Sequence, residues 1–256
     1  MITFLRKIRQ RLLVENKFTK YLFYAIGEIF LIVIGILFAL QISNWNENKK
    51  GIKKEITFLK SLKDDIDFDI STLEERIKIN ETRIANTYSI FKILQTKNEL
   101  SKKETLEFID LHVILRTESY FIPEKGTINQ IESGSHGNLI KNENLRKQIF
   151  RYYSMNNRIE NNNEKRLQLY QNSEITKHIM KKIFLSGDFG EQMFGSTFNH
   201  PRINIPNLKM DMEYFNAIAM KLGYTEHQNS IYIDIRTDAE KLIEFINEEL
   251  LKITKS

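Results

Sequence analysis

The sequence predicts an all-α protein, with one N-terminal transmembrane helix followed by an elongated antiparallel helical bundle. Three observations predict this class. One long apolar run lies near the N-terminus, apolar residues then recur at helical spacing, and only three prolines and ten glycines interrupt 256 residues. All-β folds need many turns, so this scarcity of turn-forming residues favours long helices. We expect a tail over 1–20, a transmembrane helix over 21–42 and a helical domain over 43–256.

The tail carries six basic residues against one acidic residue. Ile2, Leu5, Ile8 and Leu12 recur at helical spacing. A basic amphipathic helix of this kind can lie on an anionic membrane surface. A simpler interpretation is that the charges only orient the transmembrane helix. Both interpretations place the N-terminus in the cytoplasm.

The predicted transmembrane helix, 21–42, contains 22 residues with one ionisable side chain. At about 1.5 Å per residue such a helix spans roughly 33 Å, enough for a hydrocarbon core of about 30 Å. Tyr21, Tyr24 and Trp45 lie near its ends, where we expect them to act as interface anchors. A cleaved signal peptide is disfavoured, because the tail is long and no small-x-small cleavage site follows the apolar run.

The orientation of this helix follows from the positive charges on each side of it. Six basic residues precede the helix, and Lys49, Lys50, Lys53 and Lys54 follow it closely. Since the more positive side tends to stay in the cytoplasm, we expect the N-terminus inside and the helical domain outside.

One face of the transmembrane helix carries small residues. Gly27, Gly35 and Ala39 are spaced by multiples of four, and Glu28 lies beside them. A charge at this depth costs at least ~2.5 kcal/mol, so Glu28 is unexpected in a helix surrounded only by lipid. We hypothesise that this face packs against another transmembrane helix, in a homo- or hetero-oligomer. Alternatively, Glu28 lies alone at the membrane interface and the glycines occur there by chance. If the face packs, Gly35→Leu should reduce crosslinking between the anchors, and unchanged crosslinking would reject the hypothesis.

The helical domain begins with a predicted helix over about 47–97. Its apolar residues follow an alternating three-four spacing, as in a coiled coil. They are Ile56, Leu59, Ile66, Ile70, Leu73, Ile77, Ile84, Phe91 and Leu94. Lys63, Asn80 and Thr87 stand where the heptad requires apolar residues, so we expect one long bundle helix rather than an autonomous coiled coil.

Two shorter elements follow the long helix. Ser101 and Glu104 have the spacing of a capping box, which predicts a helix that ends near Arg116. Phe121-Ile122-Pro123 breaks the helical pattern, and a short helical turn is expected from Thr127 to Ser133.

The remainder predicts three further helices and a loop. Asn142 is expected to cap a long helix that continues past Tyr170. Residues 186–206 contain three glycines and two prolines and indicate a surface loop. The pattern then predicts a helix over 211–222 that stops at Gly223, and a last helix over about 230–253. Long antiparallel helices that each bury one stripe form a bundle.

Several N-terminal segments resemble those of a known group of proteins. They are Arg6-Lys7-Ile8-Arg9-Gln10, Glu15-Asn16-Lys17-Phe18, Lys20-Tyr21, Ala25-Ile26-Gly27-Glu28-Ile29, Ala39-Leu40-Gln41-Ile42 and Asn44-Trp45-Asn46-Glu47. This stretch resembles an uncharacterised family of bacterial single-pass membrane proteins, common in the Bacteroidota and catalogued as a domain of unknown function. The resemblance implies an inner-membrane protein with a helical domain. It implies no activity, ligand or catalytic residue.

The composition excludes several kinds of site. The chain has no cysteine, which excludes disulfides, thiolate metal ligands and cysteine nucleophiles. The 214 residues after the apolar run carry 32 basic and 31 acidic side chains. The helical domain is therefore nearly neutral, and we expect no nucleic-acid partner.

The sequence offers no convincing catalytic or metal motif. Asp65-x-Asp67-x-Asp69 starts like a calcium loop, but Ile70 and Arg76 stand where that loop needs Gly and Glu. We therefore interpret the aspartates as a solvated helix face. None of the five histidines lies within four residues of another: they are His112, His136, His178, His200 and His227. We expect no catalytic residue, cofactor or metal.

Three classes of function remain open to this architecture. The favoured one is a membrane-anchored, non-catalytic envelope protein that binds or scaffolds another protein, with the lipid bilayer as its other partner. The alternative is a sensory bundle that binds a ligand and signals through a partner transmembrane helix. An enzyme is disfavoured, because the motifs are missing.

Overall fold

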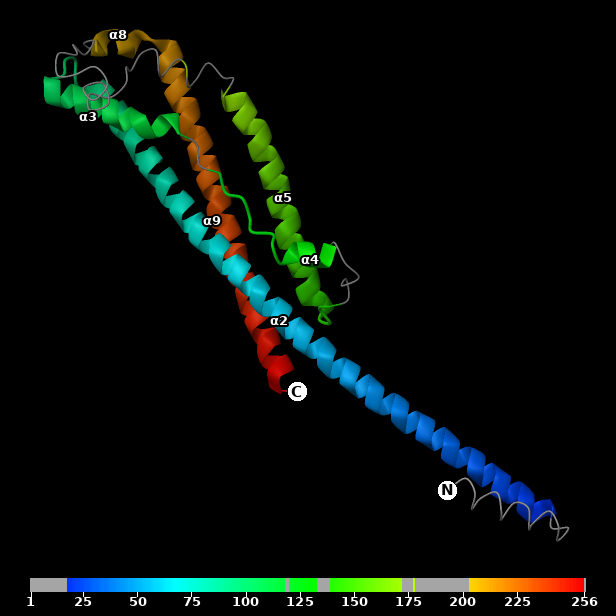
Figure 1. The fold of residues 1–256 in the computed structure, drawn as a ribbon. Helices are drawn as coiled ribbons and strands as arrows, with labels where there is room; N and C mark the ends of the chain where they lie inside the picture. Colours follow the sequence, from blue (N-terminus) through cyan, green and yellow to red (C-terminus); the bar gives the residue numbers. More distant parts are fainter. Residues whose placement is uncertain (1–17, 118–119, 133–138, 172–176, 178–202, 256) are drawn as a thin grey trace, which may run out of the picture. The chain divides into compact units, whose positions relative to one another are not determined.

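The computed structural model describes residues 18–117, 120–132, 139–171, 177 and 203–255. Every regular element in these residues is a helix, which confirms the all-α prediction (Figure 1). The chain forms two compact units that divide between Thr57 and Phe58.

The first helix, α2, extends over Phe18–Thr96 and contributes residues to both units. It contains no proline, and its three glycines do not break it because no other helix-breaking residue accompanies them. It ends one residue before the end that the apolar spacing predicts.

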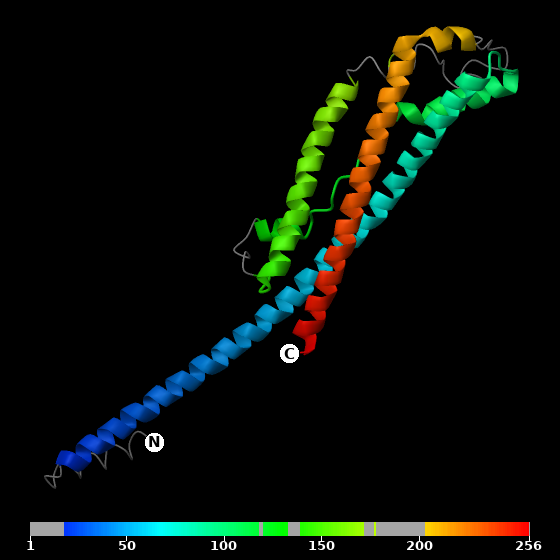
Figure 2. The ribbon, with the colours of Figure 1, turned by 180° about the vertical axis from the view of Figure 1, so that it is seen from behind.

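Three helices form the body of the second unit, and they lie side by side in both views (Figures 1 and 2). They are the part of α2 after Thr57, α5 (Glu143–Gln171) and α9 (Met212–Lys255). Asn80 on α2 donates a hydrogen bond to Gln228 on α9, and Tyr152 on α5 donates one to Asp69 on α2. These bonds show which residues of the helices lie opposite one another. Helix α9 runs antiparallel to the other two. Their shared core includes Leu59, Leu62, Ile66, Leu73, Ile149, Tyr153, Tyr232, Ile235, Ala239, Leu242 and Ile246.

A second hydrophobic cluster lies at the end of the unit where α2 stops and α9 begins. It involves α3 (Lys102–Val113), the 3-10 helix η1 (Ile114–Arg116) and α8 (Ile205–Met210). Its buried members are Ile90, Leu94, Phe108, Ile109, Leu115, Ile205, Leu208, Tyr214, Ala217 and Ile218. The two clusters give the unit two cores along its length.

The structure confirms two predicted helix caps. The Ser101 hydroxyl accepts a hydrogen bond from the Glu104 amide at 3.3 Å, and the Glu104 carboxylate accepts one from the Ser101 amide at 2.8 Å. The Asn142 side chain accepts hydrogen bonds from the amides of Asn144 and Leu145. Each cap satisfies amides that have no partner inside their own helix. The short turn α4 occupies Ile128–Glu132.

Two predicted boundaries are wrong. Gly223 does not end a helix, because α9 continues through it. An exposed glycine inside a helix costs only ~1 kcal/mol relative to alanine. The burial of Lys221 and Thr225 on either side of it outweighs this cost. The end of the predicted loop 186–206 belongs to α8, which Asn204 caps by accepting from the Asn207 amide at 3.0 Å. Residues 186–202 of that loop lie outside the described part of the chain.

The buried stripe of α2 also differs from the expected one. Ile70, Ile84 and Phe91 are only half-buried. Polar positions are buried instead, among them Asn80 and Thr87, which interrupt the heptad. The apolar spacing therefore locates the helix correctly but does not identify every side chain that faces the core.

Candidate functional site

The N-terminal part of α2 is apolar and exposed. Its most apolar stretch of 18 residues has a mean hydropathy of 2.4, and none of that stretch is buried within the structure. By length and composition this helix can cross a membrane, and it is the one helix in the described residues that can. Such a large apolar surface is unfavourable in water, because it is not buried against the protein and therefore contributes no hydrophobic free energy.

The predicted packing face lies on this exposed surface. Gly27, Gly35 and Ala39 are exposed, and Glu28 is half-buried. A methyl group added to either glycine would meet no described atom within 4 Å, so the face is open to a neighbour of any shape. Contact with a second transmembrane helix stays a prediction.

The predicted interface anchors are described only in part. The side chains of Tyr21 and Tyr24 lie outside the described residues. Trp45 is 60% exposed, and the Lys49 ammonium nitrogen lies 3.9 Å from the centroid of its ring.

Two of the aspartates on α2 hold the segment that follows η1. One Asp69 oxygen accepts a hydrogen bond from the Glu124 amide at 2.7 Å, and the other accepts one from the Tyr152 hydroxyl at 2.9 Å. Asp65 accepts a hydrogen bond from the Thr127 amide at 2.9 Å. Burial raises the pKa of Asp69 to about 6, although its two hydrogen bonds act in the opposite direction.

These contacts correct the interpretation of the aspartates as a solvated face. Asp64 and Asp67 are exposed, but Asp65 is half-buried and Asp69 is fully buried. No group of three acidic or histidine side chains that could hold a metal occurs in the part of the chain that the structure describes. Asp65 and Asp69 therefore serve as caps for a loop backbone.

His112 is buried beside a tyrosine. Its Nδ1 lies 2.7 Å from the Phe108 carbonyl oxygen, and its Nε2 lies 2.7 Å from the Tyr214 hydroxyl. Since a carbonyl can only accept, Nδ1 carries the proton and Nε2 accepts from Tyr214. Burial lowers the pKa of His112 to about 4, so the ring is neutral at pH 7. Of the other histidines, His227 is exposed, and the remaining three lie outside the described residues.

Buried cations face the C-terminal end of η1. Arg83 donates hydrogen bonds to the carbonyl oxygens of Ile114 at 3.2 Å and Thr117 at 3.0 Å, and to the Asn80 side chain at 2.6 Å. The buried ammonium of Lys221 also reaches the Thr117 carbonyl, at 3.4 Å. Carbonyl groups at the C-terminal end of a helix carry partial negative charge, which suits a cation. The Ile114 carbonyl also accepts from the Thr117 amide at 3.3 Å, so Arg83 is an additional donor to it. This arrangement joins α2 and α9 to η1.

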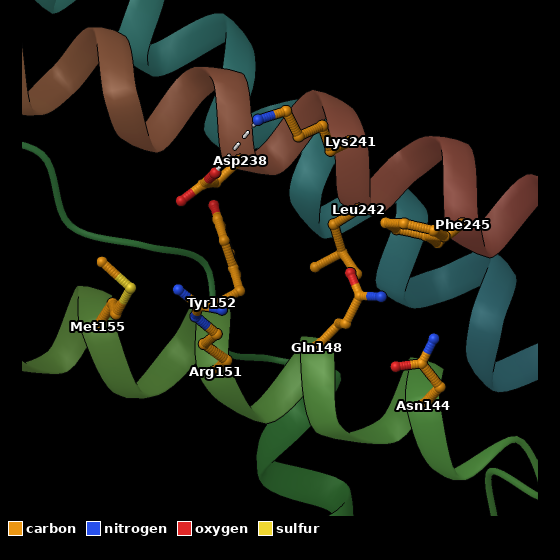
Figure 3. Close-up of a pocket in the computed structure, with 9 residues that line it drawn as sticks. All are labelled: Asn144, Gln148, Arg151, Tyr152, Met155, Asp238, Lys241, Leu242 and Phe245. Carbon is orange, nitrogen blue, oxygen red and sulfur yellow. Dashed lines mark ion pairs between the residues drawn. The ribbon is translucent and has the colours of Figure 1, made fainter.

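A groove of about 520 Å³ lies between α5 and α9 (Figure 3). Its lining comes from both helices and consists of Asn144, Gln148, Arg151, Tyr152, Met155, Asp238, Lys241, Leu242 and Phe245. Tyr152 and Leu242 are buried, whereas Met155 and Phe245 keep 42% and 39% of their surface exposed. The groove therefore offers apolar surface to a partner.

The groove has three charged side chains, of which Arg151 and Lys241 are basic and Asp238 is acidic. The Lys241 ammonium lies 3.9 Å from the Asp238 carboxylate, a pair that is exposed to solvent. Arg151 is exposed and forms no ion pair within the described residues. The groove cannot be identified from the sequence, because its residues come from two helices whose pairing is known only from the structure.

Comparison with known proteins gives one match. Residues 28–164 match the sequence model of a group described as "Family of unknown function (DUF6090)". The match covers the apolar part of α2, the Asp65 and Asp69 caps and the α5 side of the groove. No curated protein and no solved structure is significantly similar to the chain.

Proposed function

We propose that this chain, which belongs to the DUF6090 family of unknown function, is a membrane-anchored envelope protein whose helical domain binds another protein. The observation that carries this proposal is the groove between α5 and α9. In this proposal α2 crosses the inner membrane once, with the N-terminus in the cytoplasm and the helical domain in the periplasm. The protein has no catalytic role.

The groove has the composition of a protein-binding surface. Aromatic residues, Met and Arg are enriched at protein interfaces, and Tyr152, Phe245, Met155 and Arg151 all line this groove. A groove between two helices can accept the apolar face of a third, amphipathic helix. With Arg151 at its edge, the groove favours a helix that carries an acidic residue beside its apolar stripe.

A crosslinking experiment tests this proposal. A photoreactive phenylalanine analogue is placed at Phe245 or, as a matched control, at Ile233. Ile233 lies on the same helix with 38% of its surface exposed, against 39% for Phe245, but it does not line the groove. We expect a discrete crosslinked product from position 245 in cells and none from position 233.

A charge reversal makes the same test specific to the groove. Arg151→Glu should reduce the product from position 245 several-fold, because it repels the acidic partner. Its effect on folding should stay within about 0.5 kcal/mol, since Arg151 is exposed. Identical products from both probe positions, or a product that Arg151→Glu leaves unchanged, would contradict the proposal.

A sensory role is the second candidate. It is favoured by one observation: α2 contains both the apolar segment and the first buried stripe of the second unit. In this role a ligand shifts the helical domain, and the face with Glu28 and Gly35 passes the change to a partner helix. A small molecule that raises the melting temperature of the purified chain, with no protein partner present, would favour this role.

A further inference from the structure

Four lysines follow the apolar part of α2 within three helical turns. Lys49, Lys50, Lys53 and Lys54 are all exposed. None of them forms an ion pair within the described residues. Trp45, the single tryptophan of the chain, precedes them by one turn.

These five side chains share one side of the helix. Successive residues of an α-helix are rotated by about 100°, so residues four apart lie nearly above one another. Trp45, Lys49 and Lys53 therefore form a ridge, and Lys50 and Lys54 lie next to it. Together they cover about half of the helix circumference. We name these five residues the juxtamembrane lysine face.

The tryptophan fixes one ammonium beside an aromatic ring. The Lys49 nitrogen lies 3.9 Å from the Trp45 ring centroid, within the range of a cation–π contact. Indole rings favour the headgroup level of a bilayer, where one part of the ring is apolar and the other is hydrated. The contact therefore places a positive charge at the depth that the indole prefers.

Lys49 and Lys50 lie nearest to the headgroup region, and Lys53 and Lys54 lie roughly 16–18 Å beyond Ile42, at about 1.5 Å per residue. If the hydrocarbon core ends at Ile42, Trp45 lies roughly 5 Å beyond it and Lys49 roughly 10 Å beyond it, at about 1.5 Å per residue. The headgroup region extends about 5–8 Å from the hydrocarbon core. Lysine side chains are long enough to bend back toward this layer while their stems cover apolar surface.

We infer that the juxtamembrane lysine face binds the phosphate groups of anionic phospholipids. This inference rests on the proposed membrane anchoring and goes beyond it, because it specifies the lipid class of the leaflet on the side of the helical domain, which is the periplasmic leaflet in the proposed topology. An ammonium near an anionic surface contributes about 1 kcal/mol, which corresponds to roughly fivefold per lysine. Lys49 and Lys50, the two lysines nearest to the headgroups, should therefore enrich anionic lipids around Trp45 on the order of tenfold over zwitterionic lipids.

Trp45 itself reports on this enrichment. The purified full-length chain is reconstituted in phosphatidylcholine vesicles that contain a small, equal mole fraction of brominated phosphatidylglycerol or brominated phosphatidylcholine. Bromine quenches the fluorescence of an adjacent indole, and the chain has no second tryptophan. We expect brominated phosphatidylglycerol to quench Trp45 several-fold more strongly.

Two variants separate a specific face from general charge. The first variant combines Lys49→Gln, Lys50→Gln, Lys53→Gln and Lys54→Gln. In this variant the two brominated lipids should quench Trp45 to the same extent. A control variant carries the same number of glutamines on exposed lysines of the second unit, namely Lys60, Lys78, Lys92 and Lys147. The control should keep the preference of the unmodified chain.

The outcomes distinguish the inference from the proposal beneath it. If both brominated lipids quench the unmodified chain equally, or if the preference survives in the first variant, the lysine face is not a lipid site although Trp45 lies in the membrane. If neither lipid quenches Trp45 even at high mole fraction, the membrane anchoring fails, and the inference fails with it.

Discussion

Arg83→Leu should strongly destabilise the second unit. The substitution leaves the buried side-chain oxygen of Asn80 without its donor. It also removes one donor from the carbonyl oxygen of Ile114, which keeps the Thr117 amide, and one from the carbonyl oxygen of Thr117. Each unsatisfied buried acceptor costs about 1–3 kcal/mol, and Lys221 can compensate only at Thr117. We expect a loss on the order of 2–3 kcal/mol, which lowers the melting temperature by roughly 5–10 °C for a unit of this size.

Far-ultraviolet circular dichroism of the full-length chain in detergent measures this loss during heating. Arg158→Leu is the matched control, because Arg158 lies on α5 and is exposed. Arg83→Lys should recover little, since one ammonium cannot reach three acceptors in the directions that the guanidinium fork provides. A melting temperature of Arg83→Leu within about 2 °C of the control would show that Arg83 does not hold η1 in place.

The second large effect is a loss of stability in acid that depends on His112. Burial lowers the pKa of His112 from 6.5 to about 4. Because the folded pKa lies below the unfolded one, the contribution of His112 is complete above about pH 6.5 and disappears as the pH falls through about 4. A shift of this size corresponds to about 3 kcal/mol.

Asp69 acts in the opposite direction over the same range. Burial raises its pKa from 3.8 to about 6. Its contribution is therefore complete below about pH 3.8 and is lost as the pH rises through about 6. The total acid dependence of the chain mixes the two groups, so each must be isolated by comparison with a variant.

Urea unfolding between pH 7.5 and pH 4 should separate them. His112→Gln should be less stable than the unmodified chain at pH 7.5, and the difference should shrink by up to about 3 kcal/mol toward pH 4. His227→Gln, which replaces an exposed histidine, is the matched control. The Asp69→Asn variant should lose more stability than the unmodified chain as the pH falls, because it lacks the stabilising contribution that Asp69 makes in acid. If the difference in unfolding free energy between His112→Gln and the unmodified chain does not change with pH, His112 titrates alike in the folded and unfolded states, and the prediction is wrong.

The sequence predicts the helices better than it predicts what they bury. The capping box at Ser101 and the cap at Asn142 identify two helix starts, because such caps depend only on neighbouring residues. Gly223 misleads, because the local cost of a glycine is small beside the packing of a helix of 44 residues. Helix ends are thus predictable where local chemistry decides them.

The buried polar residues could not be predicted. Asp69 and Arg83 look like surface residues in a heptad pattern, and each is buried because a distant backbone segment needs a hydrogen-bond partner. Nothing near them in sequence indicates that segment. Asn80 and Thr87 give a partial signal, since both interrupt the apolar stripe and both are buried.

The apolar segment of α2 can be identified from the sequence, whereas the groove between α5 and α9 cannot. The segment is defined by consecutive residues of α2, and its composition alone identifies it. The groove depends on the alignment of Arg151 with Lys241 across two helices. Periodicity predicts each helix but not which helices are neighbours.

Cysteine labelling tests the central claim that one helix anchors an external helical domain. The chain contains no cysteine, so single cysteines at Thr3 and at Ser256 give an unambiguous signal. Each variant is treated with a membrane-impermeant maleimide in cells whose outer barrier is open and whose inner membrane is intact. We expect labelling at position 256 and none at position 3 until the inner membrane is lysed. Labelling at position 3 alone, or equal labelling at both positions before lysis, would contradict the claim.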